Sequence, residues 1–222
     1  MPSYSGVFTL QAQMQAIAAD NWPSPPLVIG QAYQGGFYAG QISTAGNGIA
    51  DYNLVIGPKS TAQTSLQWKT SNTATAGTSS VITGPANTAA MIAAGAAAHP
   101  CAQFCDNLST GGKTDWYMPA KNELEVCYYN LKPTTQVNNT SWGINANAVP
   151  ARASNYTAGT PAQTSATNFQ SGGTEAFDAN NYWCSTSPTA YSADYVRFIN
   201  GGQDNYPKTN TQRVRAIRRV AI

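Results

Sequence analysis

The chain has 222 residues, a formal net charge of +2, and only 10% charged residues, against roughly 25% in an average globular protein. This length is ample for one large domain with a hydrophobic core, and the balanced charge gives no reason to expect nucleic acid or an anionic membrane as a partner. The most apolar stretch, residues 87–105, is broken by Gly95 and Pro100, so no membrane insertion is predicted. The N-terminus lacks the basic and apolar regions of a secretory signal, so we expect a soluble protein made in a cytoplasm.

Residues 1–26 are predicted to form a short helical appendage followed by a stiff linker. Phe8, Leu10, Met14 and Ile17 recur at roughly helical spacing, and the prolines of "NWPSPP" forbid a continuing helix. Such an apolar stripe needs a partner, either the rest of the chain or another protein. Residues 27–222 are predicted to form the body of the molecule.

The first half of this body has the pattern of a mixed α/β domain. We expect strands in "PLVIGQAY", "GFYAGQI" and "YNLVIGPK", and a loop in "TSNTATAGTSSVITG". An Ala-rich helix is expected from Asn87, and a second short helix after Pro100. In "DWYMPAKNELEVCYYNLKP" a short strand over residues 116–118 is expected to precede a helix that begins at Pro119 and ends before Pro133.

The second half has long irregular segments and ends in strand patterns. Disordered segments are poor in aromatic residues, so Trp142, Tyr156, Phe169 and Phe177 predict an ordered, irregular region. Strands are expected in "YWCSTS", "DYVRFI" and "RVRAIRRV", with alternating wet and dry faces. Between the last two lies "NGGQDNYPKTNTQ", interpreted as a polar loop whose unusual length suggests a purpose.

The alternation in the last strand predicts where its arginines lie. The solvated face is expected to hold Arg213, Arg215 and Arg219, and the apolar face Arg218. One arginine is expected to pair inward, with Asp194 or Glu175 as the partner.

No catalytic residue, metal site or cofactor is predicted, and the chain is not expected to be an enzyme. His99 is the only histidine, and it is interpreted as a structural residue at a helix junction. Glu123 and Glu125 point about 200° apart on one helix, so they cannot act together. No calcium loop or phosphate-binding motif is present. The cysteines are expected to be free, buried thiols; they are Cys101, Cys105, Cys127 and Cys184.

The region around the final strands has the composition of a binding surface. Tyrosine offers rigid amphipathic contact area, and asparagine, serine and glycine offer adaptable hydrogen bonding. The predicted ligand-binding residues are Asn181, Tyr182, Tyr191, Tyr195, Asn200, Asp204, Asn205, Tyr206 and Asn210.

Three motifs resemble one known family. "DWYMPAKNELEVCYYNL" resembles W-x-L-P-[ST]-x-x-E-L, "NYWCSTSPTAYSADYVRFINGG" resembles Y-W-S-S-T…A-W-x-V-x-F-x-x-G, and "KTNTQRVRAIRRV" resembles K…x-V-R-x-[IV]-R. The family is the C-terminal domain of the Legionella collagen-like adhesin, and Met118, Ala120 and Cys184 depart from its pattern. The resemblance implies an α+β, C-type-lectin-like, loop-rich domain over residues 27–222 with a binding face near its C-terminus. The sugar-binding tripeptides of the calcium-dependent relatives are absent from the chain.

The first residues, "SGVFTLQAQMQAIAADNWP", look like the leader of phage virion and tail-fibre proteins. The sequence therefore predicts a phage tail-fibre or tail-tip protein that is located in the virion and binds a host cell-surface receptor, either a glycan or a protein. It would form a homo-oligomer, with a trimer favoured, and contact other virion proteins through residues 1–26. The alternative is a structural virion protein, such as a capsid decoration or tail scaffold. The abundance of Asn, Tyr, Ser and Asp also raises the possibility that a diversity-generating retroelement varies the last fifty or so residues.

Overall fold

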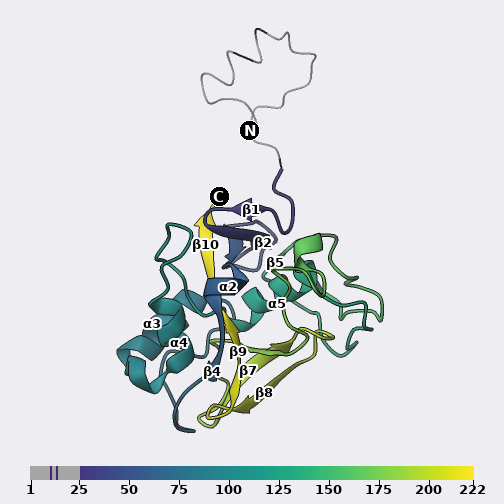
Figure 1. Ribbon diagram of the computed structural model, residues 1–222. Helices are drawn as coiled ribbons and strands as arrows, with labels where there is room; N and C mark the ends of the chain where they lie inside the picture. Colours follow the sequence, from purple (N-terminus) through teal and green to yellow (C-terminus); the bar gives the residue numbers. More distant parts are fainter. Residues whose placement is uncertain (1–10, 12–13, 15–25) are drawn as a thin grey trace.

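The computed structural model describes Gln11, Met14 and residues 26–222, and it has a mixed α+β architecture with two sheets (Figure 1). The α+β prediction is confirmed. Within residues 26–222 the helices are α2 (Lys59–Ala62), α3 (Gly84–Ala93), η1 (Ala96–Ala98), α4 (Pro100–Asp106), α5 (Lys121–Leu131) and η2 (Thr167–Phe169). Apart from Met14, which is exposed, the residues of the predicted apolar stripe (Phe8, Leu10 and Ile17) lie outside the described residues.

The strands form two five-stranded sheets. The first sheet has the order β1-β2-β3-β10, with β5 paired to β2, and the second has the order β4-β9-β6-β7-β8. All pairs are antiparallel except β6 with β9. The strand bounds are β1 (Ala32–Tyr33), β2 (Gly36–Ile42), β3 (Tyr52–Ile56), β4 (Gln63–Gln67), β5 (Ala148–Val149), β6 (Asn181–Trp183), β7 (Ser192–Arg197), β8 (Gln203–Pro207), β9 (Thr211–Arg215) and β10 (Ile217–Ala221).

Helix α5 lies between the two sheets and packs against β2 and β7. Its apolar side chains recur at i, i+3, i+4 and i+7, and all four, Leu124, Cys127, Tyr128 and Leu131, are buried. Rings from the irregular segment complete this core, since Tyr156, Phe169 and Phe177 are buried with them. The prediction of an ordered irregular region is therefore confirmed.

A second core lies between α3, α4 and the second sheet. It contains three buried tryptophans, Trp68, Trp116 and Trp183, together with Cys101 and Cys105. All four cysteines are free and buried, as expected. His99 is buried at the start of α4, where its ring lies within hydrogen-bonding distance of Thr75 Oγ1 and the Gly95 carbonyl, so its structural interpretation is also confirmed.

Three expectations about strands are wrong. The stretch "NGGQDNYPKTNTQ" is not one loop, because it contains β8, which pairs with β7 after a tight turn, and the start of β9. "RVRAIRRV" is not one strand, because the chain passes at Ala216 from β9 in the second sheet to β10 in the first. Residues 116–118 contribute only a single bridge, between Tyr117 and Ile217, and β4 was not predicted at all.

The C-terminal arginines do not form a solvated face, because both strands that carry them are covered by other parts of the chain. Arg215 is fully buried and binds Glu175 at 2.7 Å, which confirms the expected inward pairing to that residue. The other pairs are Arg213 with Asp178 at 2.8 Å, Arg218 with Asp115 at 2.6 Å and Arg219 with Glu123 at 2.8 Å. Asp194 instead pairs with Lys121, at 3.4 Å.

Candidate binding site

The register of the second sheet brings several predicted residues onto one face. Asn181 lies opposite Arg197, Tyr195 opposite Asp204, and Ala193 opposite Tyr206. Directly opposite residues share a face, and so do residues two apart on one strand. The sheet therefore displays Asn181, Tyr195, Arg197, Asp204 and Tyr206 on the same side.

A hollow of about 420 Å³ opens beside these residues. It lies where β6, a strand of only three residues, begins, between β7 and the start of β9. Every side chain in its lining carries a polar group, and none is aliphatic. The lining residues are Ser65, Asn180, Asn181, Tyr195, Arg197, Tyr206, Thr211, Gln212 and Arg213.

Two tyrosine rings and a guanidinium form one wall of the hollow. Tyr206 meets Tyr195 edge to face, with ring centroids 6.5 Å apart, and 48% of Tyr206 is exposed against 3% of Tyr195. Arg197 Nη2 donates to the Tyr195 hydroxyl at 2.7 Å, and the guanidinium lies 5.5 Å from the centroid of that ring. The Tyr195 hydroxyl and the charge of Asp204 raise the pKa of Arg197. This wall therefore presents one accessible ring and one fixed cation.

The opposite wall comes from β4 and β9. The Arg213 guanidinium is paired with Asp178, which also accepts from Lys59 Nζ and Gln63 Nε2, each at 2.9 Å. Lys59, Arg213 and Gln63 hold the pKa of Asp178 below its ordinary value in spite of partial burial. Both amide atoms of Gln212 are covered from solvent and have no hydrogen-bond partner within the described residues. This wall thus contains Arg213, whose charge is balanced by Asp178, and the amide of Gln212, which makes no hydrogen bond within the described residues.

The structure brings some of the predicted site residues together and separates others. Asn181, Tyr195 and Tyr206 line the hollow, and Asp204 is exposed on β8 beside it. Asn205 is also exposed, but it lies opposite Asp194 and therefore on the other face of the sheet. Tyr191 is 56% exposed but does not line the hollow.

Two predicted residues belong to turns. The Asn200 Oδ1 accepts from the Gly202 N–H, and Asn210 donates its backbone and side-chain N–H groups to the Pro207 carbonyl. Their short polar side chains therefore stabilise the turns at either end of β8.

The prediction that Tyr182 contacts a ligand is wrong. Its side chain is fully buried, because the alternation along β6 turns it to the face opposite Asn181. Its hydroxyl donates to Gln63 Oε1 and accepts from the Asp178 N–H, both at 2.9 Å. Tyr182 is thus a core residue that ties β6 to β4.

Asn180 belongs to the Asn- and Tyr-rich region expected to bind, but five lining residues were missed by sequence reasoning: Ser65, Arg197, Thr211, Gln212 and Arg213. The alternation of "DYVRFI" places Arg197 on the wet face of its strand, and that exposure was the available signal. Thr211 and Gln212 reach the hollow because β9 pairs with β6, and Ser65 because β4 pairs with β9. No local pattern reports that long-range pairing.

One buried lysine, Lys208, fixes the segment that carries Tyr191. Lys208 Nζ donates to the carbonyls of Thr73, Thr189 and Ala190, and lies 4.7 Å from the centroid of the Trp68 ring. Burial and the nearby Lys69 lower the pKa of Lys208 to about 8. Three carbonyl acceptors compensate in part for the desolvation of this ammonium group.

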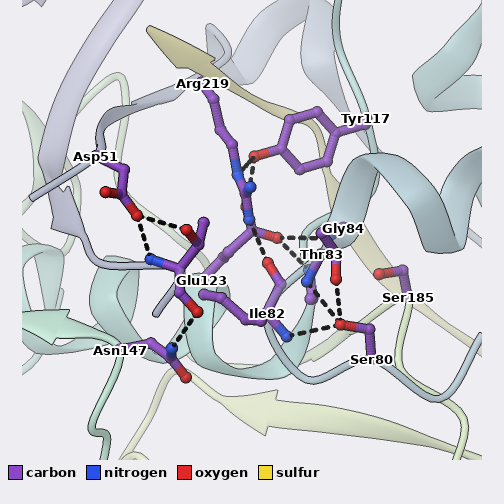
Figure 2. A network of polar contacts seen from close by, with 12 residues as sticks. Asp51, Ser80, Ile82, Thr83, Gly84, Tyr117, Glu123, Asn147, Ser185 and Arg219 are labelled. Carbon is purple, nitrogen blue, oxygen red and sulfur yellow. Dashed lines mark hydrogen bonds and ion pairs between the residues drawn. The ribbon is translucent and has the colours of Figure 1, made fainter. Parts of the chain in front are cut away.

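A buried carboxylate joins α3, α5 and β10 (Figure 2). Glu123 accepts from the Tyr117 hydroxyl at 2.5 Å, from Arg219 Nε at 2.8 Å, and from the backbone N–H of Ala120 at 2.8 Å and of Gly84 at 3.1 Å. Burial raises the pKa of Glu123, although Arg219 opposes that shift. With every oxygen engaged inside the core, this carboxylate stabilises the fold and is not available to a ligand.

The second carboxylate of α5 has its own network. Glu125 is bound by Arg152, Asn145 and the Tyr156 hydroxyl. The two glutamates therefore do not act as a pair, as expected from their spacing. The described residues contain no cluster of three potential metal ligands and no helix long and apolar enough to cross a membrane.

Comparison with known proteins identifies the family. The model of the Lcl C-terminal domain matches residues 60–218, which is more than half of the chain. The chain belongs to the Lcl C-terminal domain family. The matched range includes all nine residues of the hollow, the first two motifs that carry the resemblance, and the third motif as far as Arg218.

Two further comparisons add little to this membership. No curated protein matches the chain. A solved fimbrial protein from Bacteroides ovatus ATCC 8483 is similar at 12% identity with a TM-score of 0.44, over 78% of this chain and 36% of that one. This Lcl C-terminal domain chain thus spans about a third of the length of the fimbrial protein.

Proposed function

We propose that this chain is a non-enzymatic receptor-binding protein that contacts a cell-surface ligand through the hollow of the second sheet. The observation that carries the proposal is the convergence of Asn181, Tyr195, Arg197 and Tyr206 on one concave, polar surface. A concave site with a few convergent polar groups is the usual form of a ligand site. Membership of a family of adhesin C-terminal domains supports the same role.

The position of the hollow supports display of the site to a partner. The first sheet, which contains β1 and β10, lies toward one end of the domain, whereas β7 and β8 lie at the opposite end (Figure 1). A domain attached through residues before β1 would therefore present the hollow outward.

The finer parts of the proposal concern where the protein acts. We propose a C-type-lectin-like scaffold that forms a homo-oligomer, with a trimer favoured, in the tail fibre or tail tip of a phage virion. Multivalent attachment would raise the avidity of a weak single site. Diversification by a retroelement would be confined to exposed positions such as Asn205 and Tyr206, because most of β6 and β7 is core. A template repeat and a reverse-transcriptase gene near the coding sequence would support that variation.

Binding of the labelled full chain to a panel of bacterial strains tests the receptor-binding role. Tyr206→Ala is expected to reduce binding about tenfold, because an aromatic contact of this kind contributes roughly 0.5–1.5 kcal/mol beyond its buried area. Tyr191→Ala is the matched control, since it removes an exposed tyrosine that does not line the hollow, and it should leave binding unchanged. Equal binding by the unaltered chain and Tyr206→Ala would contradict the proposal.

The alternative is a structural virion protein whose C-terminal face packs on other subunits. Antibody labelling of intact particles separates the two roles. Many copies over a capsid, with β8 inaccessible, would favour decoration, and a few copies at fibre ends would favour adhesion. A non-enzymatic role is supported by the engagement of Glu175 and Asp178 in ion pairs. Turnover of host glycans that is lost in Glu175→Gln or Asp178→Asn would contradict it.

A further inference from the structure

We infer that the hollow binds an uncharged saccharide, held by side-chain amides and hydroxyls with a C–H face of the sugar packed on Tyr206. This inference rests on the proposed binding role and names the ligand class of the same site. The argument uses the chemistry of the lining, the pairing of its charges and the position of one ring.

The lining matches a polyhydroxylated ligand better than a protein side chain. Protein interfaces derive most of their affinity from aromatic or aliphatic anchors that fill well-packed, desolvated pockets. Here nine polar residues, and no aliphatic side chain, surround about 420 Å³. An apolar anchor would bury these amides and hydroxyls without partners, which is unfavourable for each unsatisfied group.

Both arginines of the hollow lie near a carboxylate of opposite charge, and this balance disfavours an acidic ligand. Arg213 is paired with Asp178, and the charge of Asp204 acts on Arg197 from the neighbouring strand. The remaining C-terminal arginines are held in ion pairs away from the hollow: Arg215 with Glu175, Arg218 with Asp115 and Arg219 with Glu123. The sequence is basic at this end, yet in the part of the chain that the structure describes these paired arginines form no basic stripe for a polyanion.

Tyr206 is placed as a platform for a sugar ring. Its edge-to-face contact with Tyr195 orients the ring, while nearly half of the residue stays exposed beside the hollow. Aromatic side chains provide a large, rigid contact area at low conformational cost. The ring therefore offers a ready surface to the apolar face of a pyranose.

The amides complete the set of partners. Asn181 lines the hollow next to Gln212, whose amide has no partner within the described part of the chain. Each amide supplies a donor and an acceptor in one plane, which suits two neighbouring hydroxyl groups. A turn of the Gln212 side chain toward a bound sugar would satisfy an amide that is otherwise left unpaired.

A panel of immobilised glycans tests the inference with the full chain. The probes are uncharged hexosides and N-acetylhexosaminides, carboxylated sialosides and uronides, and sulfated disaccharides. We expect binding to uncharged members that is nearly independent of sodium chloride concentration. Binding should fall about tenfold in Tyr206→Ala and in Gln212→Ala, and stay unchanged in Tyr191→Ala.

Two outcomes would overturn the inference. One is binding restricted to acidic glycans, with a steep loss on adding salt and in Arg197→Gln. The other is a complete absence of glycan binding. The Asp204→Asn variant is a further test of the first outcome. It removes the negative charge that opposes Arg197 and should raise affinity only for acidic probes.

A cell assay separates failure of the inference from failure of the proposed function. If cells bind the chain through Tyr206, but protease treatment of the cells abolishes binding and sugars do not compete, the receptor is a protein. The binding role then stands and the saccharide inference is wrong. If Tyr206→Ala binds cells as well as the unaltered chain does, the proposed function itself fails at this site.

Discussion

Glu123 shows how one residue can serve several elements. The motif that contains it was interpreted only as a helix, yet the carboxylate caps the start of α5, accepts from the start of α3 and pairs with Arg219 on β10. Arg219 also donates to the Ile82 carbonyl, so the pair fixes the loop before α3 (Figure 2). Removing only one member of a buried ion pair whose hydrogen bonds are all made is strongly destabilising, because the other charge stays buried without a partner.

Glu123→Gln is expected to lower the free energy of unfolding by about 3–5 kcal/mol, because it leaves the Arg219 guanidinium buried without its carboxylate. Urea denaturation followed by fluorescence measures the change. The double variant Glu123→Gln/Arg219→Met should recover part of the loss, since it also removes the unpaired cation. A loss below about 1 kcal/mol in the single variant would show that the pair is not important for stability.

At the scale of elements, α5 begins with half of a capping box. Glu123 at the third helical position accepts from the Ala120 N–H, but alanine at the N-cap has no side-chain acceptor to return the interaction. This is one of the positions at which the chain departs from the family pattern, which has serine or threonine there. The helix therefore keeps one uncapped N–H that the family residue would satisfy.

Ala120→Ser should raise the free energy of unfolding by about 1 kcal/mol, because its hydroxyl can accept from the Glu123 N–H. Thermal denaturation provides the measurement. Ala94→Ser is the matched control: it places the same substitution at the C-cap of α3, where an N-cap acceptor has no role. Equal effects of the two substitutions would argue against capping as the cause.

Strand β8 is an edge strand whose polar residues hinder pairing with a strand of another chain. It is the last strand of the second sheet, and an exposed edge strand invites pairing with another chain. The Asn205 N–H is taken by the Asp204 carboxylate, and Pro207 has no N–H to offer. The polar residues that make this strand difficult to predict therefore also hinder its pairing with another chain. Side chains such as Tyr206 remain available to a ligand.

At the scale of the whole molecule, the C-terminus lies at the end opposite to β7 and β8 (Figure 1), the strands that carry Tyr195, Arg197 and Tyr206 of the hollow. This arrangement makes the site of attachment decisive for activity. All four native cysteines are buried, and burial raises the pKa of their thiols, so a new exposed cysteine can be labelled selectively.

Immobilisation through a biotin at the C-terminus is expected to preserve ligand binding, whereas immobilisation through Asp204→Cys should abolish most of it. The second linkage places the support next to the hollow, because Asp204 is exposed on β8 and shares a face with Tyr195 and Tyr206. Surface plasmon resonance with the bound ligand as analyte compares the two. Free biotinylated Asp204→Cys should still fold as the unaltered chain does, which circular dichroism checks.

The helices and most hairpins could be predicted because local spacing determines them. Pro119 and Pro133 bound α5, and the apolar spacing of "GFYAGQI" and "YNLVIGPK" indicates β2 and β3. Strand β8 escaped prediction because Asp, Asn and Pro are poor strand formers, and β4 because it contains a single apolar residue, Leu66; only pairing with β7 and β9 makes them strands. The break at Ala216 was not predicted either, because the chain passes from one sheet to the other without interrupting the alternation of apolar and polar residues.

By itself, the sequence determined the α+β class, the free buried thiols, the structural role of His99 and a tyrosine- and asparagine-rich region near the C-terminus, because these depend on composition and short-range spacing. Only the tertiary structure decided which of those polar residues converge. The register of β6 turned Tyr182 into the core and Asn181 outward, and the pairing of β4 with β9 brought Ser65 and Gln212 to the same hollow. The physical reason is that a binding surface is assembled from strands distant in the chain, and hydrogen bonds between strands choose its members.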